Sequence, residues 1–352
     1  MGGRRGASDN PPNRFERLRY AEEPEGAAGP AAEDSPLRTR FFRDPSRRIL
    51  ATNDSPDVGF DTSLNPYRGC EHGCTYCYAR PTHEYLGFSA GLDFESRILV
   101  KEEAPELLRD ALASPRWVPR VVALSGVTDP YQPVEARLGL TRRCLEVFAE
   151  FRNPVSIVTK SGLVVRDLDL LGELARVDAV AVYVSITTLD EQLRSAMEPR
   201  AATAARRLAT VEALAAAGVP VCVLVAPVIP ALNDHEIPAI VKAASDAGAR
   251  CMRHILVRLP HGLSALFADW LERHYPERRQ KVLNRIRALR GGRLNDPRFH
   301  HRHRGEGPFA EQIRALFEVA CRRAGVADAG IDLSTDAFRR PLAPQLSLFA
   351  GT

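Results

Sequence analysis

Three of the seven cysteines in this chain of 352 residues fall within one short stretch. Cys70, Cys74 and Cys77 have the spacing C-x3-C-x2-C, and Gly69 and Gly73 let a short loop bring their sulfurs to one centre. Three soft thiolates on one loop favour a soft metal. The spacing therefore predicts a metal centre in this loop.

Two kinds of centre use such thiolates. A structural zinc ion closes its shell with a fourth Cys or His, and His72 is the nearby candidate, although its place between Cys70 and Cys74 directs the ring away from the metal. An iron-sulfur cube usually takes four thiolates, so three imply a cube with one iron left open for another ligand. The iron-sulfur centre is favoured, and a zinc-binding module is the alternative.

The other cysteines stand singly. An odd count with no export signal argues against a disulfide framework. We expect them to be small buried side chains, which is the usual state of free cysteines. They are Cys144, Cys222, Cys251 and Cys321.

The elements that position the cysteine loop are predicted from hydrophobic periodicity. Short β-branched runs occur at 97–101, 121–125, 155–159, 180–186, 220–226 and 252–258, with 59–65 as a further strand. Amphipathic helices are expected at 104–113, 141–151, 204–217 and 236–247, and Gly218 and Gly248 stand at C-cap positions. This alternation predicts the α/β class, as a partial (β/α)6-type parallel barrel.

Polar residues gather where the predicted strands end. They are Ser125 with Asp129, Thr159 with Lys160, Ser185 with Thr187, and Asn233 with Asp234. In parallel barrels the carboxyl edge of the strands carries the active site. We therefore expect the site at this edge.

Composition divides the chain into four parts. Residues 1–36 are predicted to be a disordered tail, 37–260 the barrel with its cysteine loop, 261–340 a helical, basic extension, and 341–352 a mobile tail. The net charge of +4 excludes a strong global attraction to nucleic acid. However, the segment 277–304 holds ten Arg or Lys residues and two acidic ones.

Membrane insertion is not expected. The longest run of low polarity, 219–232, has fourteen residues and is interrupted by Pro220, Pro227 and Pro230. A spanning helix needs roughly 18 apolar residues. The twin arginines near the N-terminus have no apolar stretch behind them, so the predicted location is the cytoplasm.

The cysteine motif resembles that of the radical S-adenosylmethionine (SAM) enzymes, which commonly have an aromatic residue before the last cysteine, here Tyr76. The resemblance narrows to the spore photoproduct lyase and photolyase-like branch. It rests on NPYRGCEHGCTYCYAR, GLDFESRILVK, SGVTDPYQP, VTKSG and APVIPALND, which together span roughly residues 59–260.

The resemblance implies two cofactors, a 4Fe-4S cluster and SAM. In such enzymes the amino and carboxylate groups of the methionine moiety chelate the open iron, and an electron from the cluster cleaves SAM to a 5′-deoxyadenosyl radical. The implied cluster ligands are Cys70, Cys74 and Cys77. The implied SAM-binding residues are Tyr76, Ser125, Thr128, Asp129, Lys160, Ser185 and Arg200, with Asp129 for the ammonium and Lys160 for the carboxylate.

One departure from that branch bears on the reaction. Spore lyases carry a hydrogen-donating cysteine just upstream of their Ser-Asp equivalent, where this chain has Gly126 or Val127. The sequence thus disfavours thymine-dimer repair by that route. It assigns no catalytic residue, and Tyr131 is either a hydrogen relay or a packing residue.

The function favoured by these features is radical SAM chemistry on nucleic acid, in repair or modification, with an electron donor for the cluster. Modification of a protein or small molecule is the alternative enzyme function. The C-terminal QLSLF resembles the peptide by which bacterial repair and replication proteins bind the sliding clamp. That prediction rests on Gln345, Leu346, Ser347, Leu348 and Phe349.

Overall fold

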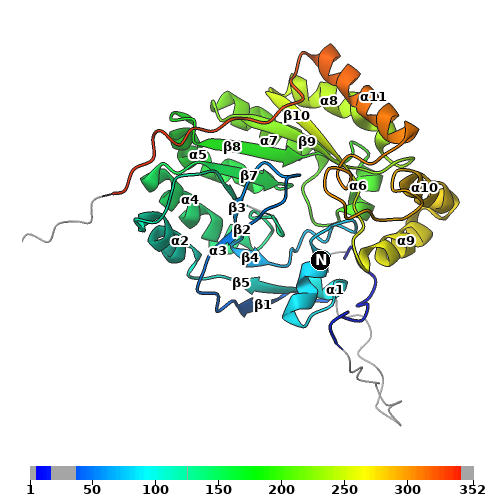
Figure 1. Cartoon of the computed structure of the whole chain (residues 1–352), viewed down its shortest axis with the longest axis horizontal. Coiled ribbons are helices and arrows are strands. Elements are labelled where there is room, and N and C mark those ends of the chain that lie inside the picture. Colours follow the sequence, from blue (N-terminus) through cyan, green and yellow to red (C-terminus); the bar gives the residue numbers. More distant parts are fainter. Residues whose placement is uncertain (1–4, 17–36, 125, 342–352) are drawn as a thin grey trace, which may run out of the picture.

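A sheet of mostly parallel strands organises the fold. The computed structural model describes residues 5–16, 37–124 and 126–341, and within them the larger sheet has seven strands in the order β10-β9-β8-β7-β6-β3-β2. Its strands are β2 (Leu50–Thr52), β3 (Thr62–Leu64), β6 (Val122–Leu124), β7 (Val155–Thr159), β8 (Val180–Ser185), β9 (Val221–Val228) and β10 (Cys251–Leu256). All neighbours from β3 to β10 pair in parallel, and β2 is antiparallel to β3 (Figure 1).

Helices alternate with these strands, as the sequence predicts. They are α2 (Ala104–Ala113), α3 (Glu135–Leu138), α4 (Leu140–Phe151), α5 (Leu168–Ala175), α6 (Glu191–Met197), α7 (Ala204–Ala216) and α8 (Ile237–Asp246). Three 3-10 helices, Arg80–Leu86, Gly162–Asp167 and Asp234–Glu236, lie among the described connections. Gly218 and Gly248 have φ of 74° and 92°, which confirms their role in ending α7 and α8. The partial (β/α)6-type barrel is confirmed.

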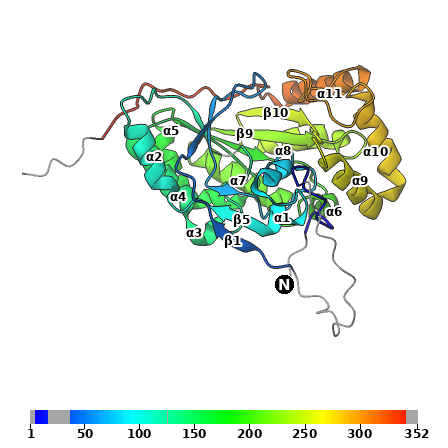
Figure 2. The ribbon, with the colours of Figure 1, turned by 60° about the horizontal axis from the view of Figure 1, so that its bottom comes forward.

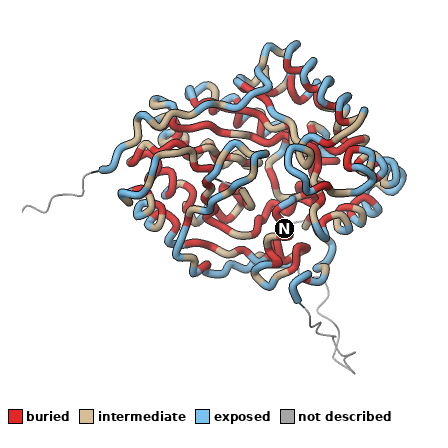
Figure 3. Tube along the Cα trace, viewed as in Figure 1, coloured by how far each residue is buried: buried red, intermediate tan, exposed pale blue. Residues whose placement is uncertain are grey.

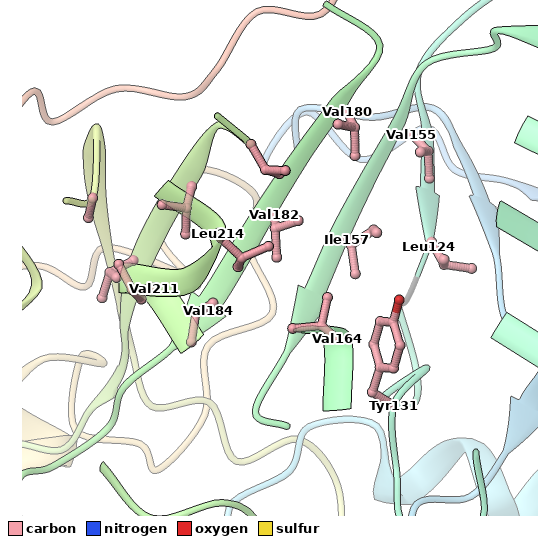
Figure 4. Packing of buried hydrophobic residues seen from close by; sticks show 14 of the residues in the cluster. Leu124, Tyr131, Val155, Ile157, Val164, Val180, Val182, Val184, Val211 and Leu214 are labelled. Carbon is pink, nitrogen blue, oxygen red and sulfur yellow. The ribbon is translucent and has the colours of Figure 1, made fainter. Parts of the chain in front are cut away.

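The main core lies between the strands and their covering helices. Val182 and Val184 of β8 pack with Val211 and Leu214 of α7, all fully buried (Figure 4). Each buried aliphatic side chain of this kind stabilises the fold by roughly 1.5–3 kcal/mol. The central strands are largely buried, and five of the six residues of β8 are so (Figure 3). This packing fixes the strand ends at which the predicted site residues lie.

One predicted barrel strand belongs elsewhere. The run at 97–101 forms β5 (Arg97–Val100), which follows α1 (Leu92–Ser96) and lies in a separate three-stranded sheet. There it pairs with β1 (Arg40–Arg43) and with β4 (Tyr67–Arg68), the strand that leads into the cysteine loop. Apolar periodicity predicts a strand but not its partner, which explains the error. The small sheet supports the cysteine loop.

The helical extension packs against the cysteine loop. It comprises α9 (Leu263–His274), α10 (Pro276–Ala288) and α11 (Pro308–Ala324), which gather at one end of the molecule (Figure 2). Cys74 and Tyr76 share an apolar cluster with Phe267 and Trp270 of α9. The Trp270 indole donates a hydrogen bond to the Ala196 carbonyl at 3.0 Å. The extension therefore helps to hold the cysteine loop in place.

Residues 5–16 are ordered by specific contacts, so the predicted disordered tail is wrong for this stretch. The backbone amides of Gly6 and Ala7 donate to the buried Glu95 carboxylate at 2.9 and 2.8 Å. Asn13 is buried, and its amide donates to the Glu84 carbonyl at 2.8 Å. Composition failed here because hydrogen bonds, rather than apolar burial, hold the segment.

Substitution of Gly6 tests this contact. A Cβ at Gly6 would lie 1.7 Å from the carbonyl oxygen of Gly73 in the cysteine loop. Because that neighbour is backbone, Gly6→Ala should destabilise the protein by about 1–3 kcal/mol, seen as a lower midpoint in thermal unfolding. Gly59→Ala is the matched control, since its Cβ meets nothing within 4 Å. Equal midpoints for the two variants would contradict the packing described here.

Some predicted features lie outside the described residues. They are Ser125, residues 17–36 and the clamp-like peptide from Gln345 to Phe349. Among the described residues, no helix has the length and apolar character that crossing a bilayer requires.

Candidate functional site

The three cysteines lie in a tight loop between β4 and the 3-10 helix Arg80–Leu86. Cys70 and Cys74 are buried, Cys77 is half-buried, and all three are free thiols. The Cys77 amide donates to the Cys74 carbonyl at 3.3 Å. Gly69 and Gly73 have φ of 81° and 68°, so both adopt the left-handed conformation that favours glycine and lets a short loop turn tightly.

The electrostatics of the loop call for positive charge. Burial, followed by the neighbouring Asp129 carboxylate and the other two thiols, raises the pKa of Cys70 well above its usual range. Burial raises the pKa of Cys74 to about 12. The thiolate forms of Cys70 and Cys74 are therefore disfavoured here until a cationic centre compensates them. A cluster of iron ions supplies that charge, so the donor set fits an iron-sulfur centre.

A zinc site finds no support in the arrangement. Within residues 5–16, 37–124 and 126–341, no group of three or more His, Cys, Asp or Glu side chains is placed to hold a metal ion, which applies to zinc and to a cluster alike. His72 is buried, and its Nδ1 lies 3.3 Å from the Asp129 carboxylate. The side chain considered as a fourth zinc ligand thus already has a carboxylate partner.

Asp129 joins the ends of two strands to the cysteine loop. Its Oδ1 accepts from Thr159 Oγ1 at 2.8 Å and from the Tyr131 amide at 2.9 Å. Its Oδ2 accepts from the Lys160 amide at 2.7 Å and faces His72. Burial opposes the charge on Asp129, but His72 and these hydrogen bonds outweigh it and lower the pKa.

The contacts of Asp129 alter the role expected for it. A carboxylate has about four acceptor positions, and four protein donors already surround this one. A cofactor ammonium would have to share or displace one of them. The structure therefore gives Asp129 a positioning role between the loop and the strands.

Lys160 has the property that the sequence prediction requires of it, since it is a cation beside the cysteine loop without an ion-pair partner among the described residues. Its ammonium lies 5.9 Å from the centre of the Tyr76 ring, beside the cysteine loop. No carboxylate is within ion-pair distance of it in the described part of the chain. Its charge acts on both Cys74 and Glu198. This cation at the end of β7 is available to an anionic group of a ligand.

Tyr76 belongs to a buried polar network. Its hydroxyl donates to the Glu198 carboxylate and lies 3.2 Å from Thr187 Oγ1. Glu198 also accepts from Thr187 Oγ1 at 2.6 Å and forms a buried ion pair with Arg207 of α7. The network ties the loop to the end of β8 and to α7.

Three further candidates have protein partners. Thr128 Oγ1 donates to the Gly69 carbonyl at 2.7 Å, so Thr128 holds the start of the cysteine loop. Ser185 is buried at the end of β8, and its carbonyl accepts from Arg207 at 2.9 Å. The Arg200 guanidinium lies 3.0 Å from the Glu71 carboxylate, inside the loop. Arg200 therefore braces the loop, and any cofactor carboxylate would compete with Glu71.

Sequence reasoning missed two buried pairs behind the loop. They are Glu198 with Arg207, and Arg80 with Glu95 at 3.1 Å. Arg80 also donates to the Gly73 and Cys74 carbonyls at 3.0 and 2.9 Å. No periodic signal marks either pair, because the partners come from different elements. Tyr131 is buried in the main core with its hydroxyl on Asp167 at 3.0 Å, which favours the packing role over the relay.

Comparisons with known proteins agree with this geometry. The profile of the Radical SAM superfamily matches residues 64–244. The chain belongs to the radical SAM superfamily. As such an enzyme it uses a 4Fe-4S cluster and SAM.

Relatives of this radical SAM enzyme occur in bacteria and archaea. The uncharacterized protein Rv2578c of Mycobacterium tuberculosis is 39% identical over 244 residues, covering 68% of this chain and 71% of that protein. The uncharacterized protein MJ0683 of Methanocaldococcus jannaschii is 28% identical over 222 residues, covering 63% and 79%.

Solved structures of spore photoproduct lyase share the fold. A mutant with bound AdoMet and dinucleoside spore photoproduct has a TM-score of 0.57 at 16% identity, covering 80% of this chain and 78% of that one. The complex with dinucleoside spore photoproduct also has a TM-score of 0.57, at 15% identity and the same coverage. At 15–16% identity this structural likeness shows a shared fold and nothing more.

Proposed function

We propose that this radical SAM enzyme acts on nucleic acid, with its cluster held by Cys70, Cys74 and Cys77. When bound, the cluster and SAM supply a 5′-deoxyadenosyl radical by one-electron reductive cleavage. The chain's own residues hold the loop closed against the strand ends. Asp129, Thr128 and Arg200 brace it through the contacts described above, and the Lys160 ammonium, which lies beside the loop, would receive the SAM carboxylate.

The observation that carries the nucleic-acid substrate is a cation beside the cysteine loop, at the point where the barrel meets the basic extension. The Arg258 guanidinium lies 5.5 Å from the centre of the Tyr78 ring, and Tyr78 directly follows Cys77. Arg258 therefore brings a cation to the rim of the site, and its Nη1 lies 3.1 Å from Nε2 of His303 in the extension. Phosphate groups of a substrate would neutralise such a cation. The dinucleoside ligand of spore photoproduct lyase, whose fold this chain shares, is consistent with that substrate class.

Only part of the basic segment 277–304 is available for contacts with phosphate groups. Arg290 is buried and donates to the carbonyls of Val257 and His301 at 2.8 and 2.9 Å. Arg298 pairs with Asp296 and Glu306, and Arg302 pairs with Asp57. Within 277–304, the exposed cations without such an ion pair among the described residues are Arg278, Lys281, Arg293 and Arg304. These are better candidates for phosphate contacts than Arg290.

Isotope transfer tests the substrate class. The reconstituted enzyme is incubated anaerobically with dithionite, SAM and nucleic acid purified from cells grown in D2O. Because the 5′-deoxyadenosyl radical takes a hydrogen atom from its substrate, the 5′-deoxyadenosine formed should gain deuterium, measured by mass spectrometry. The protein and small-molecule fractions of the same cells serve as parallel donors, and the Cys74→Ala variant as the blank. If only the protein fraction or only the small-molecule fraction transfers deuterium, the substrate belongs to that class and the proposed nucleic-acid substrate is refuted.

A further inference from the structure

An exposed surface of aromatic rings and cations adjoins the cysteine loop. Tyr78 is 50% exposed although it follows the half-buried Cys77, and Phe299 of the extension is 49% exposed. Arg258, just after β10, contacts the Tyr78 ring, and Arg302 contacts the Phe299 ring. We call these four residues the rim surface: Tyr78, Arg258, Phe299 and Arg302.

The rim surface is held in place by the end of β10. The Tyr78 hydroxyl donates to the Gly126 carbonyl at 2.6 Å, and Arg258 lies over the Tyr78 ring. Arg258 Nη1 is 3.1 Å from His303 Nε2, and the His303 carbonyl accepts from the Leu256 amide at 3.0 Å. Two exposed rings are thus presented on a fixed backbone.

The two arginines of the surface differ in how far they are neutralised. Arg302 pairs with Asp57 while its guanidinium carbon lies 4.6 Å from the centre of the Phe299 ring. Arg258 has no carboxylate within ion-pair distance in the described residues, and its buried Nε–H lacks a hydrogen-bond partner. Burial and the charges of Arg258 and Arg302 lower the pKa of His303 to about 4, so His303 is neutral near pH 7 and can accept from Arg258. Arg258 therefore keeps a charge that no carboxylate of the described residues neutralises, which leaves it able to attract an anion.

We infer that the rim surface binds an unpaired nucleotide, with a base stacked on Tyr78 or Phe299 and the adjacent phosphate on Arg258. This inference rests on the proposed function and narrows its substrate class. Aromatic faces bind bases only when these are unstacked from their neighbours, whereas a duplex offers mainly phosphates to a protein surface. The combination of exposed rings with an unpaired arginine thus favours single-stranded nucleic acid, or a nucleotide turned out of a duplex, over an intact duplex.

Binding measurements on the reconstituted holoenzyme test the inference. Fluorescence anisotropy is followed with labelled oligothymidylate and oligouridylate of about 12 nucleotides and with a hairpin duplex of the same length. The wild type should prefer the single strands. Tyr78→Leu and Phe299→Leu should each weaken single-strand binding at least about fivefold, with less effect on the duplex. Arg258→Gln should lower the slope of log affinity against log salt by about 0.7.

Matched controls separate local from general effects. Tyr85 is a 71% exposed aromatic with Arg14 beside its ring, so Tyr85→Leu should retain the affinity. Arg120 lies 5.6 Å from the Trp117 ring centre, before β6 and thus at the opposite edge of the sheet, so Arg120→Gln should retain the salt slope. Iron content and the thermal midpoint of each variant report whether it is folded.

The outcomes distinguish this inference from the function on which it rests. If deuterium passes from nucleic acid but both aromatic variants bind single strands like the wild type, the rim surface is overturned and the substrate class stands. Equal wild-type affinity for single strands and duplex would also overturn it. If the wild type binds neither form and takes no deuterium from nucleic acid, the proposed function itself fails. Since Tyr78 adjoins the cysteine loop, Phe299→Leu decides the matter should Tyr78→Leu lose iron.

Discussion

Replacing Cys70, Cys74 or Cys77 by alanine is expected to abolish SAM cleavage. The remaining cysteines are not available as substitutes, because Cys144, Cys222, Cys251 and Cys321 are buried in other parts of the structure. With two thiolates left, the loop should fail to hold the cluster. The measurements are iron content after anaerobic reconstitution, the brown absorbance of the cluster, and the 5′-deoxyadenosine formed with dithionite.

The four other cysteines provide the controls for this prediction. Alanine at Cys144 or Cys321 should leave the iron content unchanged, because neither thiol lies in the cysteine loop. Full iron and full cleavage in the triple variant Cys70→Ala, Cys74→Ala, Cys77→Ala would refute the ligand assignment. A colourless protein that retains one zinc ion instead would favour the structural-metal alternative.

The barrel was predictable because its strands and helices carry strong periodic signals. The predicted helix 104–113 coincides with α2, and the runs at 155–159 and 180–186 match β7 and β8 within one residue. Apolar side chains on buried parallel strands form near-continuous runs, which single-sequence reasoning detects well. The carboxyl-edge cluster followed from the same topology, and it placed Asp129 and Lys160 next to the cysteine loop.

What the sequence missed depends on contacts between distant elements. No role is predicted for Glu95 from the sequence, yet its carboxylate is fully buried and accepts from Gly6, Ala7 and Arg80. Such residues become visible only when the fold brings their partners together. The same reason explains Asp129: its charge marked it as a ligand for a cofactor ammonium, whereas four protein donors give it a positioning role.

The second large effect expected is a loss of folding stability when Glu198 is substituted, because Glu198 belongs to a buried ion pair. Its carboxylate is fully buried and accepts from Tyr76, Thr187 and Arg207. Burial alone would raise the pKa of Glu198, but the charges of Arg207 and Lys160 and the hydrogen bonds lower it to about 2. The carboxylate is thus the counter-charge that keeps Arg207 tolerable inside the protein.

Glu198→Gln should lower the free energy of unfolding by about 3–5 kcal/mol, because it leaves the Arg207 guanidinium buried without a counter-charge. That is a large share of the roughly 5–15 kcal/mol that stabilises a typical protein. The measurement is denaturant unfolding near pH 7. Since Tyr76 precedes Cys77 and donates to Glu198, the variant should also lose iron faster to a chelator than the wild type.

The pH dependence gives the sign of the same interaction. The pKa of Glu198 is lower in the folded state than its ordinary value of 4.5. Its stabilising contribution is therefore present above that ordinary value and is lost as the pH falls toward about 2. The unfolding free energy of the wild type should decline over this window more steeply than that of Glu198→Gln. Parallel declines would show that Glu198 contributes no charge to stability.

Asp169→Asn is the control that isolates burial. Hydrogen bonding to Arg142 lowers the pKa of Asp169 to about 2, the same value as for Glu198, yet the Asp169 side chain is 59% exposed. Solvent screens such a pair, so this variant should cost at most about 1 kcal/mol. A similar loss in both variants would mean that the buried network around Tyr76 is no more than another salt bridge. A several-fold larger loss for Glu198→Gln would show that the cysteine loop is anchored through a charge that water cannot replace.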